Sequence, residues 1–386
     1  MARPQTPRSG SILVIVMVTL LFTAAALIAF LDRAGDDLLV EAHVAESNRL
    51  RMQAYSALEV TLAVLEDFRQ AGNGLRTPAE GWADPLSWAG WSPADGRTVD
   101  VSFQDESGKI PLIHATSTVL MNLFQSWQIS KDDSQRLTDA VLGWMQQGYV
   151  PTSLTGTDYE QSAIPYDPPL RSMRSLSELA AIDVARDLLF NPDGRPNALW
   201  WRFYNDFSIF DFRQINIHGA NSDVLSAVGQ FDGDQQQILA DYLAGTGKYQ
   251  NLGQQWFQST QAVGAVMGGL GNPAGFGVTI SALRINITVH EGRSQFRLSA
   301  VIAPQGGATL VQTTATDMKS GTSTSGAGTT ATPGTTTTNT QPSAAPTSAQ
   351  TSAAATVNLQ YPDTVLEILE NDAIPVEPPS PPAPPS

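Results

Sequence analysis

The residues best suited to chemistry are few in this chain and lie far apart in the sequence. The 386 residues include no cysteine, which excludes thiolate metal sites and cysteine nucleophiles, and only four histidines (His43, His114, His218 and His290). The histidines are too widely spaced for an HExxH motif, and no Gly-x-Ser-x-Gly elbow occurs. The glycine-rich stretch 264–275 lacks the Lys-Ser/Thr ending of a phosphate-binding loop. We therefore expect no catalytic residues and predict that the chain is not an enzyme.

Charge limits the partners as well. The chain has 22 Lys and Arg residues against 37 Asp and Glu residues, which gives a net charge of −15. A nucleic acid is attracted by a basic surface that neutralises its phosphates, and this composition offers no such surface. We expect no nucleic acid among the partners.

The N-terminus carries the strongest signal in the sequence. An uncharged run rich in Leu, Ile, Val and Ala extends from Ser11 to Leu31. At a helical rise of ~1.5 Å per residue it would be roughly 31 Å long, about the thickness of a bilayer's hydrocarbon core. Arg3 and Arg8 precede the run and Asp32 follows it, so the positive-inside rule predicts a cytoplasmic N-terminus with the bulk of the chain outside.

Three interpretations of this run compete. A secretory signal would have a shorter apolar region followed by a small-residue cleavage site. An uncut signal anchor fits the run. In the third interpretation, cleavage falls before the run, between Gly10 and Ser11, because a short basic leader ending in Gly resembles the type III signal of the type IV pilin superfamily. That resemblance implies that a prepilin peptidase removes residues 1–10 and N-methylates Ser11.

The stretch after the apolar run favours the third interpretation. Between Leu31 and Pro78 there is no proline, and Gly35 is the one glycine before Gly72. Apolar residues recur there at steps of three and four, as an amphipathic helix requires: Leu50, Ala54, Ala57, Leu58, Leu62 and Leu65. A continuous helix over 11–70 would be about 90 Å long. This resembles the N-terminal spine of pilins and pseudopilins.

One departure from that superfamily narrows the resemblance. Most members carry Glu at the fifth mature position, which here is Ile15, and no acid occurs before Asp32. An intramembrane Glu offsets the charged amine of a neighbouring subunit, so a subunit with no neighbour above it is better without one. The absence is typical of one class, and the chain resembles the general secretion pathway protein K family, the large minor pseudopilins of type II secretion systems.

Further motifs follow the order found in that family. The matching segments are Trp82–Trp88, Asp105–Ile110, Leu137–Trp144, Asp158–Glu160 with Tyr166, Ser175–Leu179, Ile215–His218 and Gln360–Asn371. The resemblance implies a subunit at the tip of the pseudopilus that primes its assembly and supports export of folded proteins from the periplasm across the outer membrane. It implies I- and J-type minor pseudopilins and the major pseudopilin as partners, and a single-pass location in the bacterial inner membrane with the C-terminal bulk in the periplasm. A minor pilin of a type IV pilus and a signal-anchored periplasmic hydrolase are the alternatives.

The family also raises the question of a metal. Some members bind calcium, which needs several carboxylate oxygens converging on one ion. The candidates are Asp158, Glu160 and Asp167, but the family's acidic patch is replaced here by Gly143–Gly148. We expect no cofactor and acids on a solvated loop, with a calcium site as the open alternative.

The predicted fold class is α+β: a long transmembrane spine helix packed on a small antiparallel sheet, the pseudopilin fold, with a large inserted all-α domain. Strand patterns occur at Thr98–Gln104 and Ile110–His114, and a hairpin pattern at 278–289 and 295–302. Helical spacing occurs at Val119–Trp127, Ser134–Met145, Ser175–Phe190 and Asp223–Ala244.

These patterns divide the chain into eight segments. After the leader (1–10) and the spine (11–70, with 11–31 in the membrane) come the first part of the α/β domain (71–115), the inserted helical domain (116–245) and the sheet hairpin (246–304). The remainder is a Thr/Ser/Ala-rich insertion expected to be disordered (305–356), a last strand (357–372) and a Pro-rich tail (373–386).

Overall fold

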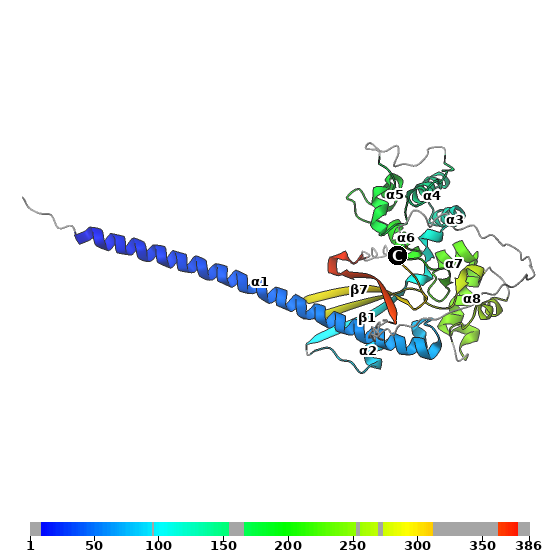
Figure 1. The fold of residues 1–386 in the computed structure, drawn as a ribbon, viewed down its shortest axis with the longest axis horizontal. Helices are drawn as coiled ribbons and strands as arrows, with labels where there is room; N and C mark the ends of the chain where they lie inside the picture. Colours follow the sequence, from blue (N-terminus) through cyan, green and yellow to red (C-terminus); the bar gives the residue numbers. More distant parts are fainter. Residues whose placement is uncertain are drawn as a thin grey trace, which may run out of the picture. The chain divides into compact units, whose positions relative to one another are not determined.

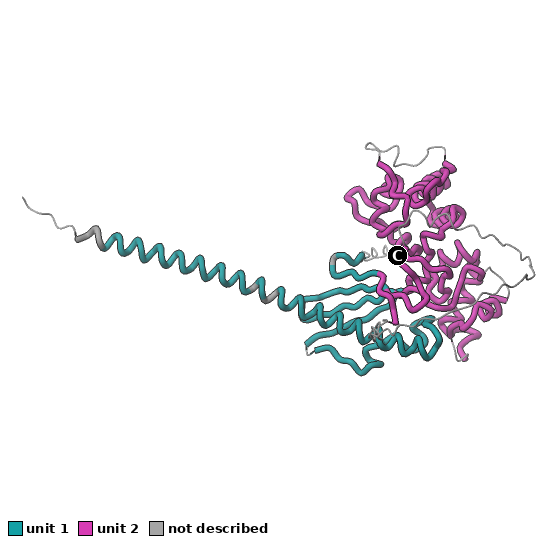
Figure 2. Tube along the Cα trace, viewed as in Figure 1, with its two compact units in different colours: residues 1–104, 284–301, 367–386 teal, residues 105–283, 302–366 magenta. Residues whose placement is uncertain are grey.

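A computed structural model describes residues 9–94, 96–153, 166–251, 255–268, 273–311 and 362–376. Most of the predicted insertion, the predicted leader up to residue 8 and the end of the tail lie outside these ranges. The chain divides into two compact units (Figure 2): residues 1–104, 284–301 and 367–386 form the first, and residues 105–283 and 302–366 form the second.

The first unit is built on one long helix, α1 (Ser9–Gly72). It is continuous because no proline interrupts it, and it ends where Asn73 and Gly74 take positive φ angles of 53° and 124°. Gly74 N donates to Arg69 O at 2.9 Å and closes the last turn. The short helix α2 (Pro85–Trp88) packs against α1, and Phe68 and Trp88 bring their rings to 5.0 Å.

Four strands form the main sheet in the order β1-β6-β7-β8 (Figure 1). Their bounds are β1 (Arg97–Asp105), β6 (Leu283–Glu291), β7 (Ser294–Pro304) and β8 (Asp363–Glu370). The predicted hairpin is confirmed as β6 and β7, which turn at Gly292 with φ 58°. Its first strand begins at Leu283 rather than at Val278, and β8 confirms the C-terminal strand within the described residues.

The predicted strand at Ile110–His114 is wrong beyond its first two residues. β2 covers only Ile110–Pro111, and a 3-10 turn follows at Leu112–His114. Pro111 cannot donate to a strand partner, and the side chains from Ile110 to Leu112 are all buried instead of alternating. β2 pairs in parallel with β3 (Phe207–Ser208) in the second unit rather than with the main sheet.

The second unit is mostly helical, as predicted. Its helices are α3 (Ser117–Ser126), α4 (Lys131–Met145), α5 (Asp183–Leu189), α6 (Ala198–Asp206), α7 (Ser222–Gly229), α8 (Gly233–Ala244) and α9 (Thr260–Val266). A short parallel pair joins β4 (Ile215–Asn216) to β5 (Phe276–Gly277). The predicted helix Asp223–Ala244 is broken, because Gln230 adopts a left-handed φ of 53° and Asp232 starts α8 with a capping box.

Aromatic residues fill the core of this unit. Phe124 of α3 and Trp127, which follows α3, contact Phe203 of α6 and Phe207 of β3, with ring centroids between 4.4 and 6.5 Å apart. Phe124 and Phe203 are fully buried. The fold class predicted from the sequence is thereby confirmed: a long helix, a small sheet and a large helical part.

Candidate functional site

The N-terminal part of α1 is an apolar surface on which none of the described residues pack. The candidate span is Leu13–Leu38, and its most apolar 18-residue window has a mean hydropathy of 2.8 and is 0% buried. Large side chains are open on every side, for example Leu13 at 66%, Phe22 at 73% and Phe30 at 68% exposed. By length and composition this helix can cross a membrane.

The residues predicted for processing and assembly lie at the start of this surface. Gly10 and Ser11 are in the first turn of α1, and Ile15 lies one turn later with 59% of its surface exposed. Within the described part of α1, the first acid remains Asp32. Gly10, Ser11 and Ile15 thus lie at one end of α1, where the apolar stretch begins.

The second half of α1 is fixed to the rest of the first unit. Leu50, Ala54, Ala57 and Leu65 are each at most 2% exposed, which matches the predicted apolar spacing. Figure 1 shows this half of the helix lying along the sheet. At the end of β8, Glu370 accepts hydrogen bonds from two consecutive turns of the helix.

Arg51 Nε donates to Glu370 Oε1 at 2.9 Å, and Tyr55 OH donates to the same oxygen at 2.7 Å. Burial and the hydrogen bond to Glu370 raise the pKa of Tyr55, so its hydroxyl stays a donor at physiological pH. This contact fastens the C-terminal strand to the helix at the point where α1 becomes buried.

In the second unit, two of the sequence motifs meet in a polar network. Ser107 donates to Asp105 Oδ1 through its backbone N at 2.9 Å and through Oγ at 2.6 Å. Asn216 Nδ2 donates to Asp105 Oδ2 at 2.6 Å. Both carboxylate oxygens of Asp105 are thus satisfied by donors, one set from the 3-10 turn Glu106–Gly108 and one from β4.

The network continues through a histidine whose tautomer is fixed by its partners. Phe257 N donates to His218 Nε2 at 2.8 Å, so Nε2 carries no proton. His218 Nδ1 lies 2.9 Å from Asn216 Oδ1 and must be the donor there. The imidazole is therefore neutral, and the hydrogen bonds run in one direction from Phe257 through His218 and Asn216 to Asp105.

Close backbone packing accompanies these hydrogen bonds. A Cβ on Gly108 would lie 2.4 Å from the Gly219 backbone, and a Cβ on Gly219 would lie 2.4 Å from Asp105 Oδ2. Both positions need glycine for lack of space rather than for an unusual φ angle. Burial raises the pKa of Asp105 to about 6, against the opposing effect of its hydrogen bonds to Ser107 and Asn216.

This arrangement joins segments rather than preparing a reaction. Every polar atom of the Asp105 carboxylate is engaged, and the network ties together residues 105–108, 215–218 and 257. The sequence motifs pointed to Asp105–Ile110 and Ile215–His218 separately, but no spacing rule indicated that they would touch.

The predicted metal candidates are not assembled within the described residues. Asp158 and Glu160 lie outside those residues, and Asp167 is exposed. In the ranges that the structure describes, no group of three or more His, Asp or Glu side chains could hold a metal ion. The calcium alternative stays a prediction.

Sequence reasoning missed the role of Asp139, which anchors the described residues just before position 154. Asp139 is fully buried in α4 and accepts hydrogen bonds from Tyr149 OH at 2.7 Å, Thr152 N at 3.0 Å and Ser153 N at 2.6 Å. Burial alone would raise its pKa, but these hydrogen bonds outweigh burial and lower it. The sequence signal that could have indicated this role is an acid surrounded by apolar residues within the motif Leu137–Trp144.

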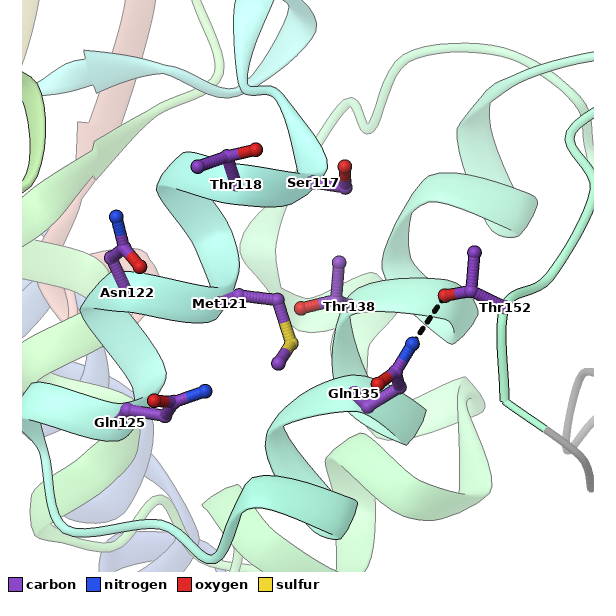
Figure 3. Close-up of a pocket in the computed structure, with 8 residues that line it drawn as sticks. All are labelled: Ser117, Thr118, Met121, Asn122, Gln125, Gln135, Thr138 and Thr152. Carbon is purple, nitrogen blue, oxygen red and sulfur yellow. Dashed lines mark hydrogen bonds between the residues drawn. The ribbon is translucent and has the colours of Figure 1, made fainter.

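A pocket of about 290 Å³ lies between α3, α4 and Thr152 (Figure 3). Its lining is Ser117, Thr118, Met121, Asn122, Gln125, Gln135, Thr138 and Thr152. Gln135 Nε2 donates to Thr152 Oγ1 across one side of it. None of the described residues that line the pocket can act as an acid or base near neutral pH.

Comparison with known proteins gives a family for part of this unit. Residues 105–190 match the family model described as "Type II secretion system (T2SS), protein K". The resemblance inferred from the sequence is confirmed over this segment, which contains four of the motifs named above. No curated protein matches the chain.

Solved structures include a similar chain in "The Crystal Structure of the GspK-GspI-GspJ complex from enterotoxigenic Escherichia coli Type 2 Secretion System". The match has a TM-score of 0.47 and 12% identity, and it covers 71% of this chain and 97% of the other. At that level of similarity the family model, rather than the solved structure, supports the assignment.

Proposed function

We propose that this chain, which carries the protein K domain of the type II secretion system, works as the minor pseudopilin at the tip of the pseudopilus. There it primes assembly and supports export of folded proteins from the periplasm across the outer membrane. The observation that carries the proposal is the family match over residues 105–190 in a chain whose first helix presents an uncovered apolar surface.

The placement in the cell follows from α1. An apolar helix that is open on all sides is stable in lipid, where its side chains need no protein cover. Arg3 and Arg8 precede the apolar stretch, and Asp32 and Asp36 follow it. The proposed location is the inner membrane, crossed once, with the sheet and the helical unit in the periplasm.

Processing is the next part of the proposal. A prepilin peptidase cuts between Gly10 and Ser11 and methylates Ser11, which leaves a mature chain that begins with the apolar helix. The position of both residues in the first turn of α1, directly before the exposed stretch, supports this. An ordinary secretory cleavage would instead remove the membrane anchor.

The tip position rests on the missing acid. Ile15 stands where most pilin-like subunits carry Glu, and from Ser11 to Leu31 there is no charge. Without that carboxylate the subunit has nothing to offset the amine of a subunit stacked above it. The solved structure noted above is a GspK-GspI-GspJ complex, and we propose the I- and J-type minor pseudopilins, with the major pseudopilin below, as partners of this chain.

The proposal includes no catalytic role. The Asp105 network has its donors and acceptors engaged with one another, and its histidine is held neutral by Phe257. The alternative of a signal-anchored hydrolase would need an accessible nucleophile beside a base, and these described clusters do not supply that pair.

Subunit counting tests the tip position. Pseudopili are purified at two average lengths, and the ratio of this chain to the major pseudopilin is measured by quantitative mass spectrometry. We expect the amount of this chain per filament to be independent of length, and expect it to copurify with the I- and J-type subunits. An amount that grows in proportion to length contradicts the tip position, and copurification with pilus subunits instead supports the type IV pilus alternative.

A variant at Ile15 refines the same test. Ile15→Glu restores the usual acid, and Ile15→Leu is the matched apolar control. A tip subunit does not need this acid, so Ile15→Glu should give no gain in secretion over Ile15→Leu. A requirement for Glu at this position for full secretion would contradict the proposal.

A further inference from the structure

Two acidic side chains meet between α6 and α7 of the helical unit, away from the network and the membrane helix described above. Asp206 is the last residue of α6 and is 1% exposed. Asp223 is in the first turn of α7. Nothing in the proposed secretion function uses either group.

The oxygens of Asp206 are unequally satisfied. Asn221 Nδ2 donates to Asp206 Oδ1 at 2.5 Å, while Asp206 Oδ2 is buried and has no hydrogen-bond donor among the described residues. An ionised carboxylate would leave that oxygen buried without a donor, which is costly. A protonated oxygen would itself be a donor and would need only an acceptor.

Asp223 is the acceptor available on the facing helix, because its side chain interacts with that of Asp206. Its Oδ2 accepts from Arg202 Nη2 at 2.8 Å and from the indole Nε1 of Trp127 at 3.2 Å. It also lies at the positive N-terminal end of α7, whereas Asp206 lies at the negative C-terminal end of α6. Both helix ends therefore favour negative charge on Asp223 and disfavour it on Asp206.

We infer that Asp206 and Asp223 form a carboxylic acid–carboxylate pair in which Asp206 holds the proton, so that the contact between α6 and α7 responds to pH. When the proton leaves, two negative charges face each other across a partly buried contact, where the guanidinium of Arg202 pairs with Asp223. Asn221 transmits the effect, because its Oδ1 caps α7 by accepting from Val224 N at 2.9 Å while its Nδ2 holds Asp206.

The surrounding charges agree with this assignment. Trp127 contributes a neutral indole from α3, and Arg202 stacks over its ring at 5.6 Å. On another side of α6, Lys109 lies over the ring of Tyr204 at 4.6 Å and is paired with Glu106 at 3.0 Å. Burial first, and then the charge of Asp223, raise the pKa of Asp206 to about 7.

The sign of the pH dependence follows. The folded-state pKa of Asp206 is raised above its ordinary value of 3.8, so its contribution to stability is fully present below that value. The contribution is lost as the pH rises through about 7. The helical unit is thus fastened more firmly on the acid side of neutrality.

Thermal unfolding of the full chain in detergent micelles tests the inference at about pH 5.5 and about pH 8.5. Asp206→Asn keeps a hydrogen-bond donor for Asp223 but cannot ionise, so its midpoint relative to wild type should be higher at the alkaline pH than at the acid pH. The control is Asp193→Asn, an exposed turn residue, which should shift both midpoints equally. Equal shifts for Asp206→Asn at the two pH values would overturn the inference.

Infrared spectroscopy gives a reading that does not depend on stability. At about pH 5.5 the carbonyl band of protonated carboxyl groups should be weaker in Asp206→Asn than in wild type, and the band lost should be one that titrates away near neutrality in wild type, whereas the contribution of Asp105 remains in both. In Asp223→Asn the band should disappear at a lower pH, because Asp206 loses its charged neighbour. A wild-type spectrum in which Asp206→Asn removes no such band contradicts the inference.

Discussion

The two halves of α1 are equally helical and both rich in apolar residues, but they are covered differently. In the first half Leu13 and Phe30 are 66% and 68% exposed, while in the second half Leu50 and Leu65 are 2% and 1% exposed. The second half has apolar residues on one face and polar ones on the others, which suits packing on a sheet. In the first half the stretch from Leu13 to Leu31 is apolar all round, which suits lipid. One helix therefore has an uncovered apolar stretch and a half that packs on protein.

Two carboxylates of the helical unit, in contrast, have their hydrogen-bond partners within the chain. The carboxylates of Asp105 and Asp139 receive donors from the chain itself. That unit needs no partner to satisfy them, whereas the first half of α1 needs an apolar environment from outside. Of the surfaces compared here, the exposed apolar part of α1 is therefore the one that needs cover from outside the described residues.

The largest expected effect comes from the same substitution in each half of α1. Leu65→Ala removes a buried side chain and should lower the free energy of unfolding by about 2–5 kcal/mol. Leu20→Ala, at a position 63% exposed, should change it by less than about 0.5 kcal/mol. Urea denaturation of both variants in detergent measures the difference, and equal losses would mean that the two halves are covered alike.

A pH titration distinguishes two acids of the second unit, Asp105 and Asp139. The pKa of Asp105 is raised from 3.8 to about 6, so its contribution to stability is present below pH 3.8 and lost as the pH rises through 6. Two pKa units correspond to roughly 3 kcal/mol. Asp139 has a lowered pKa, and its contribution is lost as the pH falls instead.

Asp105→Asn should therefore flatten the fall in unfolding free energy between about pH 4 and about pH 6, and Asp139→Asn should not. Chemical denaturation at several pH values measures both. If the pH dependence of the unfolding free energy is unchanged in Asp105→Asn, ionisation of this carboxylate does not destabilise the folded state.

The glycine contact of the Asp105 network gives a smaller effect. Gly219→Ala would place Cβ 2.4 Å from Asp105 Oδ2 and 2.7 Å from Asp105 Cβ, and should destabilise the head by about 1–3 kcal/mol. Gly264→Ala is the matched control in α9, where nothing lies within 4 Å, and should be neutral or stabilise by up to about 1 kcal/mol. Similar denaturation midpoints for the two variants would rule out the tight contact.

The smallest effect concerns the point where α1 passes from exposed to buried. Tyr55→Phe deletes the hydrogen bond to Glu370 and keeps the ring, so it should cost about 0.5–1.5 kcal/mol. Hydrogen exchange of β8 should quicken in this variant if the contact fastens the strand. Unchanged exchange would place the attachment of β8 elsewhere.

Much of this fold could be predicted because its signals are local. The spine follows from apolar spacing without proline, and the β6–β7 hairpin follows from alternation around Gly292. The strand at Ile110–His114 was wrong because Pro111 and continuous burial favoured a turn. The helix over Asp223–Ala244 was broken because a left-handed Gln230 is invisible to apolar periodicity.

The contacts of the head could not be read from the sequence. Asp105 and Asn216 are 111 positions apart and meet only through the tertiary fold. No spacing in the sequence indicates that Asp206 is buried next to α7. By contrast, the prediction for Gly10, Ser11 and Ile15 depends on spacing along one helix, which can be counted in the sequence.

The mature N-terminus tests the central claim most directly. The protein is purified from the inner membrane of its own host, and its N-terminal peptide is identified by mass spectrometry, alongside a Gly10→Val variant that should remain uncut. We expect the wild-type chain to begin with a methylated Ser11. A chain that still begins at Met1, or one that begins after the apolar stretch, would contradict it.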